Sequence, residues 1–218
     1  MDVKRRYPDG SAKHAIISAL ISDATEDRPL RLDIYAVDKE PAARQTPDTL
    51  LKSFPAEIAF RFPDGGRCRA GVADFYRRAA RGDKGFRLIK WLEGPLVTEV
   101  QLSGPPVRAA GGADPDLLVI FGLRLFSESQ AVRVEVVVES PWPDVPGNIP
   151  YDVEVSVDGA RVLAKENVGY WNHRMPYWLK DKDRNLGHFA HARWRKVFWS
   201  GKKPPEAHVR YDLPYLVS

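Results

Sequence analysis

The sequence predicts a mostly β protein, a large β-sandwich or barrel-like sheet assembly of about twelve strands with one or two short helices. Three observations lead to this prediction. Short runs of apolar and β-branched residues recur along the 218-residue chain. Turn-forming Pro-Asp-Gly and Asp-Gly sequences separate several of these runs. The 18 prolines and 16 glycines leave little room for long helices.

Each predicted strand is short, and it is either apolar throughout or alternates between apolar and polar residues. Residues 13–21 are apolar and β-branched, which is typical of a mostly buried strand. Residues 30–37 alternate, which is typical of a strand with one exposed face. The same patterns predict strands at residues 57–62, 67–72, 86–92, 97–102, 117–126, 132–139, 151–157, 161–165, 193–199 and 207–211.

Turns and helices are predicted between these strands. The turn sequences at residues 7–11 and 158–159 lie between strand-like runs and are expected to form hairpin tips. One short helix is expected over residues 46–53, where Thr46 is a candidate N-cap and Pro47 takes the first helical position. A second is expected over residues 72–80. Residues 104–115, rich in Gly, Pro and Ala, are expected to form an exposed loop.

The chain is expected to form a single β-rich domain over residues 1–218, or two subdomains with a boundary near residues 104–115. The turn at residues 7–11 needs a partner strand that starts almost at the first residue, so we expect a piece of a longer protein. No apolar run is long enough to cross a bilayer, and the charged first seven residues do not form a signal peptide. The sequence does not assign a cellular compartment.

Several classes of chemistry find no support in the sequence. The single cysteine, Cys68, forms neither an internal disulfide nor a multi-cysteine zinc site, and we interpret it as a small, half-buried strand residue. The sequence contains no P-loop, dinucleotide-binding fingerprint or nucleophile elbow. We therefore predict no cofactor and no metal, and we assign no catalytic residue. The net charge of +4 is mild, so nucleic acid is not an expected partner.

The most uneven part of the sequence is residues 169–210, which hold four of the six tryptophans and four of the five histidines. Aromatic faces stack on sugar rings, and cations neutralise carboxylates. This mixture suits an acidic polysaccharide, whereas the structural alternative is that the rings fill the core and the cations are solvated. The predicted ligand-binding residues are Trp171, His173, Tyr177, Trp178, His191, Arg193, Arg195 and Trp199.

Three short sequences resemble one known family. The sequence RYPDGSAKHA at residues 6–15 is similar to a turn in the N-terminal β domain of exo-rhamnogalacturonan-lyase-like bacterial proteins. The sequence WLEGPLV at residues 91–97 resembles a strand entry of that group, and HARWRKVFW at residues 191–199 resembles the end of the same β region. The resemblance implies a β-rich accessory domain, of RIFT-barrel or β-sandwich type, at the front of a larger carbohydrate-active or surface protein.

We therefore expect a non-catalytic β domain that binds or positions a polysaccharide, which is acidic if the basic residues contact it. One alternative is a polysaccharide lyase or hydrolase that uses His and Tyr side chains of the same region. The other alternative is a structural module of a phage-like or surface assembly, in which the aromatic and basic stretch packs against a flanking domain or partner chain. A membrane is not an expected partner.

Overall fold

The computed structural model describes residues 2–16, 18, 47–112, 114, 117–139, 150–168, 173–174, 189–190 and 193–202. Strands dominate this part of the chain, which contains two five-stranded sheets, two two-stranded pairs and two helices. The predicted fold class is confirmed: the protein is mostly β, and its sheets form a sandwich-like assembly that does not close into a barrel. No helix of the described residues is long and apolar enough to span a membrane.

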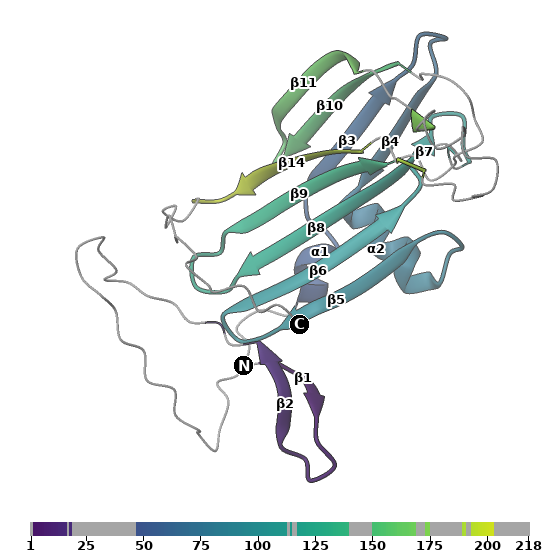
Figure 1. The fold of residues 1–218 in the computed structure, drawn as a ribbon. Coiled ribbons are helices and arrows are strands. Elements are labelled where there is room, and N and C mark those ends of the chain that lie inside the picture. The colour runs from purple at the N-terminus through teal and green to yellow at the C-terminus, as the bar shows by residue number, and fades with distance from the viewer. Residues whose placement is uncertain are drawn as a thin grey trace, which may run out of the picture.

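The chain begins with an antiparallel hairpin of β1 (Asp2–Arg6) and β2 (Ala12–Ile16), which projects from the sheets (Figure 1). At the hairpin tip, the amide of Gly10 donates a 2.9 Å hydrogen bond to the carbonyl oxygen of Tyr7. The hairpin predicted from the Pro-Asp-Gly turn is therefore confirmed.

The strand predicted over residues 13–21 is shorter and more exposed than expected. It ends at Ile16, and Ser18 is not in a strand. Ile16 pairs with Asp2, which is the first residue of β1. Lys13 is exposed, because a two-stranded hairpin has no second layer over most of its length. The strands predicted at residues 30–37 and 207–211 lie outside the described residues.

The first large sheet has the strand order β11-β10-β3-β4-β7, with antiparallel neighbours throughout. The residues of β3, β4 and β10 alternate between the core and solvent, as the alternating sequence predicts, whereas those of the edge strand β11 are mostly exposed. In β3, for example, Ile58 and Phe60 are buried, whereas Glu57 and Arg61 are exposed. The strands are β3 (Ala56–Arg61), β4 (Arg67–Gly71), β7 (Val107–Arg108), β10 (Tyr151–Val157) and β11 (Ala160–Val168).

The second large sheet has the order β14-β9-β8-β6-β5 and is also antiparallel. Its central strands carry the most apolar sequences of the chain, and alternate residues of β8 are fully buried. The strands are β5 (Arg87–Glu93), β6 (Val97–Gly104), β8 (Leu118–Phe126), β9 (Val132–Glu139) and β14 (Arg193–Ser200). A separate two-residue pair joins β12 (His173–Arg174) to β13 (Phe189–Ala190).

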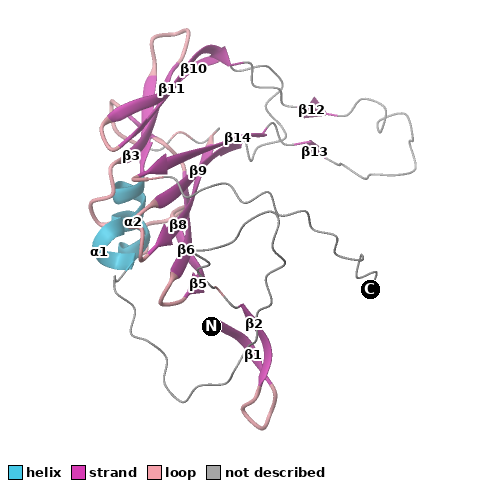
Figure 2. Ribbon diagram, turned by 90° about the vertical axis from the view of Figure 1, so that its left-hand side faces the viewer, coloured by secondary structure: helices cyan, strands magenta, loops and turns pink. Residues whose placement is uncertain are grey.

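The core lies between the two large sheets and includes the helices α1 (Pro47–Leu51) and α2 (Val72–Arg81). Figure 2 shows that the helices lie on the same side of the second sheet as β3, so they close the part of that sheet that the first sheet leaves uncovered. Phe75 of α2 is fully buried and contacts the ring of Phe121 edge-on at 5.5 Å. One core cluster contains residues from both sides of residues 104–115.

The loop predicted at residues 104–115 is only partly exposed. Residues 109–112 form an exposed turn, in which the amide of Arg108 donates to the carbonyl oxygen of Gly112 at 2.9 Å. Pro106 and Asp114 are buried, however, and β7 pairs with β4. The prediction of an exposed loop was therefore wrong for these positions, because a two-residue strand at a sheet edge leaves no periodic pattern in the sequence.

Candidate functional site

The predicted ligand-binding residues are only partly within the described chain. Arg193, Arg195 and Trp199 lie in β14, and His173 lies in β12. Trp171, Tyr177, Trp178 and His191 lie outside the described residues. The indole of Trp199 is half-buried and stacks on the ring of Phe126, with the ring centroids 5.9 Å apart. A common binding surface for these eight residues stays a prediction.

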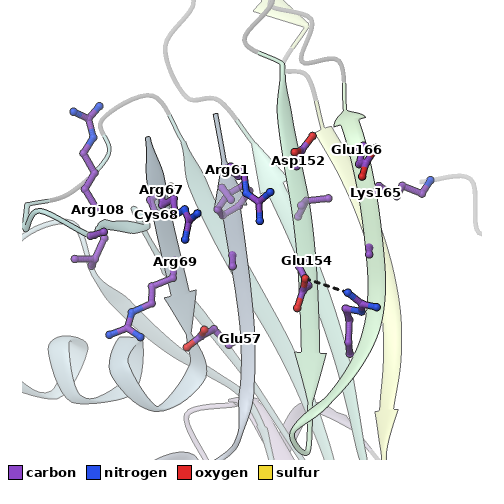
Figure 3. Close-up of a pocket in the computed structure, with 17 residues that line it drawn as sticks. Glu57, Arg61, Arg67, Cys68, Arg69, Arg108, Asp152, Glu154, Lys165 and Glu166 are labelled. Carbon is purple, nitrogen blue, oxygen red and sulfur yellow. Dashed lines mark ion pairs between the residues drawn. The ribbon is translucent and has the colours of Figure 1, made fainter. Parts of the chain in front are cut away.

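A different site stands out in the described part of the chain: a hollow on the solvent face of the first sheet (Figure 3). It has a volume of about 620 Å³ and extends over β3, β4, β7, β10 and β11. Because side chains alternate along a strand, the same pairing that buries Phe60 and Cys68 turns Arg61, Arg67 and Arg69 outward. The alternation that buries the apolar residues of the hairpin β3–β4 therefore also places its arginines in the hollow.

The hollow continues at both ends of β4. One adjoining hollow, of about 660 Å³, shares Arg67, Arg108 and Ala109 with it. The other, of about 510 Å³, shares Glu57, Arg69 and Val107 with it. We call the three together the β4 groove. The five residues of β4 span about 14 Å at the antiparallel rise of roughly 3.4 Å per residue, so the groove is elongated.

Strand pairing arranges the charged residues of the β4 groove in rows. Asp152 of β10 pairs with Arg61 of β3, and Arg61 pairs directly with Arg67 of β4. The Arg61 and Arg67 side chains of β3 and β4 therefore stand side by side on the solvent face, with the carboxylates of Asp152 and Glu154 on the β10 side and that of Glu57 nearer Arg69 (Figure 3). Like charges directly opposite each other on a sheet destabilise it slightly, so the Arg61–Arg67 pair is not expected to contribute to the stability of the fold.

Within the described chain, two arginines on β7 and β11 form ion pairs, whereas the arginines of β3 and β4 do not. Arg108 has a partner, because its guanidinium lies 3.3 Å from the carboxylate of Asp114, which is 4 % exposed. Arg161 lies 3.6 Å from the carboxylate of Glu154. For Arg61, Arg67 and Arg69 the described residues provide no carboxylate at ion-pair distance.

The carboxylate nearest to Arg61 in the pairing scheme is directed elsewhere. The Oδ1 atom of Asp152 accepts a 3.0 Å hydrogen bond from the backbone amide of Asn167 on β11. Asn167 has φ = 49°, a left-handed conformation that asparagine tolerates, and it lies at a register shift between β10 and β11. This irregularity directs the carboxylate of Asp152 toward β11, and within the described chain Asp152 forms no ion pair with Arg61.

Among the described residues, the floor of the hollow consists of small side chains and has no exposed aromatic ring. Ala59 and Ala164 line it between longer charged side chains. Phe60 is the one aromatic lining residue of the hollow among those described, and it is only 3 % exposed. Neutral sugar rings are usually bound by stacking on aromatic faces, so this hollow is better suited to an anionic ligand.

The described residues do not form a metal site, since no group of three or more His, Cys, Asp or Glu side chains gathers among them. Cys68, interpreted from the sequence as a half-buried strand residue, lies in β4 and is 3 % exposed, so it is more deeply buried than predicted. Burial raises the pKa of its thiol to about 12, so it is not an activated nucleophile despite the flanking arginines.

The sequence contains a signal for this site that its net charge and composition do not reveal. Arginine alternates with core residues at positions 67 and 69, and the turn at residues 63–66 folds the preceding strand back onto them. In that turn the amide of Phe62 donates to the carbonyl oxygen of Gly66 at 2.9 Å, which closes the hairpin and places Arg61 opposite Arg67. The registers with β10 and β7 could not be predicted, because those strands are distant in the sequence.

Comparison with known proteins adds no assignment, because no family model, no curated protein and no solved structure matches the chain.

Proposed function

We propose that this chain is a non-catalytic β domain that binds an acidic polysaccharide in the β4 groove. The observation that carries the proposal is the Arg61–Arg67 pair, two exposed guanidinium groups directly opposite each other without an ion-pair partner among the described residues. A planar guanidinium binds a carboxylate through two parallel hydrogen bonds, and a bound anion would relieve the repulsion between the two arginines.

The length of the β4 groove supports a polymer rather than a single small anion. Arg67 and Arg69 are two residues apart on β4, so their backbones are separated by roughly 7 Å. Cations repeated along an elongated groove bind repeated anionic groups. The proposal agrees with the family resemblance of residues 6–15, which implies an accessory domain of a carbohydrate-active or surface protein. The aromatic and basic residues at positions 169–210 remain a second proposed contact surface.

The carboxylates of the first hollow lack the environment of a general acid, and the buried Asp114 of the adjoining hollow is held in an ion pair with Arg108. Glu57 and Glu154 are both solvent-exposed. A carboxyl group that acts as a general acid in glycoside hydrolysis is instead held in a desolvated environment. We therefore propose binding without turnover. Incubation with polygalacturonate, followed by the absorbance of unsaturated uronate products, tests this part: accumulation of such products would show a lyase instead.

Affinity electrophoresis in gels containing polygalacturonate tests the binding. The variant Arg61→Gln/Arg67→Gln removes the arginine pair, and Arg5→Gln/Arg87→Gln removes two exposed arginines outside the groove with the same change in net charge. We expect the first variant to lose about tenfold or more in affinity, since each charge-assisted hydrogen bond contributes about 1.5–3 kcal/mol. The second variant should stay within about twofold, because distant exposed charges contribute little.

Two outcomes would overturn the proposal. The first is that the unmodified chain is not retarded by polygalacturonate or by any other acidic polysaccharide at low ionic strength. The second is that both double variants lose affinity equally, since binding would then follow net charge rather than the groove. A gel containing neutral dextran serves as the control for nonspecific retardation.

A further inference from the structure

The middle of the β4 groove has a row of residues that pair across all five strands of the first sheet. Its order is Ala164, Glu154, Ala59, Arg69 and Val107. Ala59 is half-exposed at the centre of this row. All five residues line the same hollow, so the row crosses its floor.

Ala59 marks a gap between groups of opposite charge. Glu154 lies one strand away on β10, and the Arg61–Arg67 pair occupies the next outward-facing row along β3 and β4. These steps correspond to about 4.8 Å across the strands and about 7 Å along them. Glu154 forms its ion pair with Arg161 on the other side, at 3.6 Å, and not with Arg61 or Arg67. Among the described residues that line the hollow, Ala59 provides the floor between them with its methyl group.

The two sides of this gap have different chemistry. The arginine pair attracts an anionic substituent (Figure 3). Glu154 accepts hydrogen bonds and repels anions, so it suits hydroxyl groups. The ion pair of Glu154 with Arg161 places its carboxylate on the edge-strand side of the gap, away from the arginine pair. A sugar ring in the gap would therefore be oriented with its anionic group toward the arginine pair and its hydroxyl groups toward Glu154.

Building on the proposed function, we infer that Ala59 is the floor of a single sugar subsite for a polysaccharide with one carboxylate per ring. The ring lies over Ala59, its carboxylate contacts the Arg61–Arg67 pair, and its hydroxyl groups donate to Glu154. The subsite discriminates against polymers with anionic groups on both edges of each ring, because one of those groups would face the carboxylate of Glu154.

Two substitutions test the subsite by affinity electrophoresis, with polygalacturonate as the singly charged polymer and dextran sulfate as the densely charged one. Ala59→Leu fills the gap without changing charge and should weaken binding to polygalacturonate at least tenfold. Its matched control is Gln101→Leu, an exposed position on β6 of the other sheet, which should change binding less than twofold. Ala59→Ser keeps the gap open and should bind as the unmodified chain does.

Glu154→Gln removes the repulsive charge and gives the second readout. It should raise the affinity for dextran sulfate several-fold and lower or preserve the affinity for polygalacturonate, so the ratio of the two affinities shifts toward dextran sulfate. Unchanged melting temperatures show that each variant is folded, and the Glu154 variant decides the question if Ala59→Leu unfolds.

The outcomes separate the subsite from the proposed function. If the unmodified chain binds polygalacturonate and the arginine variants lose it, but Ala59→Leu binds normally and Glu154→Gln leaves the affinity ratio unchanged, then the groove binds acidic polysaccharide and the subsite is wrong. If the unmodified chain binds no acidic polysaccharide, the proposed function itself fails.

Discussion

A close approach between two strands of the second sheet gives a quantitative test of the packing. Gly104, the last residue of β6, is buried against the ring of Phe86, which precedes β5. A methyl group at position 104 would overlap that ring, with only 2.7 Å to its Cε1 atom. The ring is not free to turn away, because it contacts the ring of Phe75 edge-on at 5.2 Å and has the guanidinium of Arg78 over it at 5.0 Å. Gly104→Ala must therefore displace part of the contact between α2 and the sheet.

The expected magnitude follows from two opposing effects. Alanine lowers the conformational entropy of the unfolded chain and stabilises a compatible strand position by about 0.4–1 kcal/mol. Overpacking a well-filled core costs about 1–3 kcal/mol. At Gly104 the overlap should dominate, and the free energy of unfolding should fall by about 1–2 kcal/mol. Gly122 of β8 is the matched control, because a methyl group there would meet the Cβ atom of Glu135 at an ordinary 3.4 Å.

Urea unfolding monitored by tryptophan fluorescence provides the measurement. Gly104→Ala should lower the unfolding midpoint, whereas Gly122→Ala should leave it unchanged or raise it. Replacing Phe86 by Leu in the Gly104→Ala background should recover part of the loss, because the shorter side chain removes the overlap. A midpoint for Gly104→Ala equal to or above that of Gly122→Ala would refute the close packing of Phe86 on β6.

Two further predictions concern the first sheet. Cys68 should resist iodoacetamide in the folded chain at pH 8 and react after denaturation in urea. Burial raises the pKa of its thiol to about 12 from 9.0, so the free energy of unfolding should fall as the pH rises from about 9 toward 12. The Cys68→Ala variant should lack this part of the pH dependence. Rapid alkylation of the folded chain, measured by mass spectrometry, would contradict the buried placement. Arg67→Thr should raise the free energy of unfolding by about 0.2–1 kcal/mol at low salt, because it removes the like charge opposite Arg61, and the gain should shrink at high salt. Arg87→Thr, at a position opposite Ser103, should show no such salt-dependent gain, and equal effects of the two variants in chemical denaturation would count against repulsion at the pair.

The parts of the fold that the sequence predicts are those set by neighbours along the chain. The hairpin β1–β2 follows from the Pro-Asp-Gly turn, and α2 starts at Val72 as its periodicity indicates. The sequence does not show which strands pair with each other or where the pairing ends. Residues 13–21 form one mostly apolar run, yet β2 ends at Ile16, where its pairing with Asp2 of β1 ends. Likewise the pairing of β3 with β10, which brings Glu154 beside Ala59, joins strands about ninety residues apart that local patterns cannot connect.

The same distinction explains why composition alone does not point to the β4 groove. Composition draws attention to residues 169–210, where aromatic and basic residues are dense in the sequence. The β4 groove instead gathers its charges from five strands, each of which has an ordinary composition. Its functional signal is that a sheet places Arg61 and Arg67 opposite each other at a cost in stability. If Arg67→Thr stabilises the fold while Arg61→Gln/Arg67→Gln abolishes polysaccharide binding, stability and binding trade off at one pair of residues, as expected of a site whose arrangement serves a ligand. If the arginines can be removed with no loss of binding and no gain in stability, the pair is an ordinary solvated surface, and the groove loses the observation on which its proposed function depends.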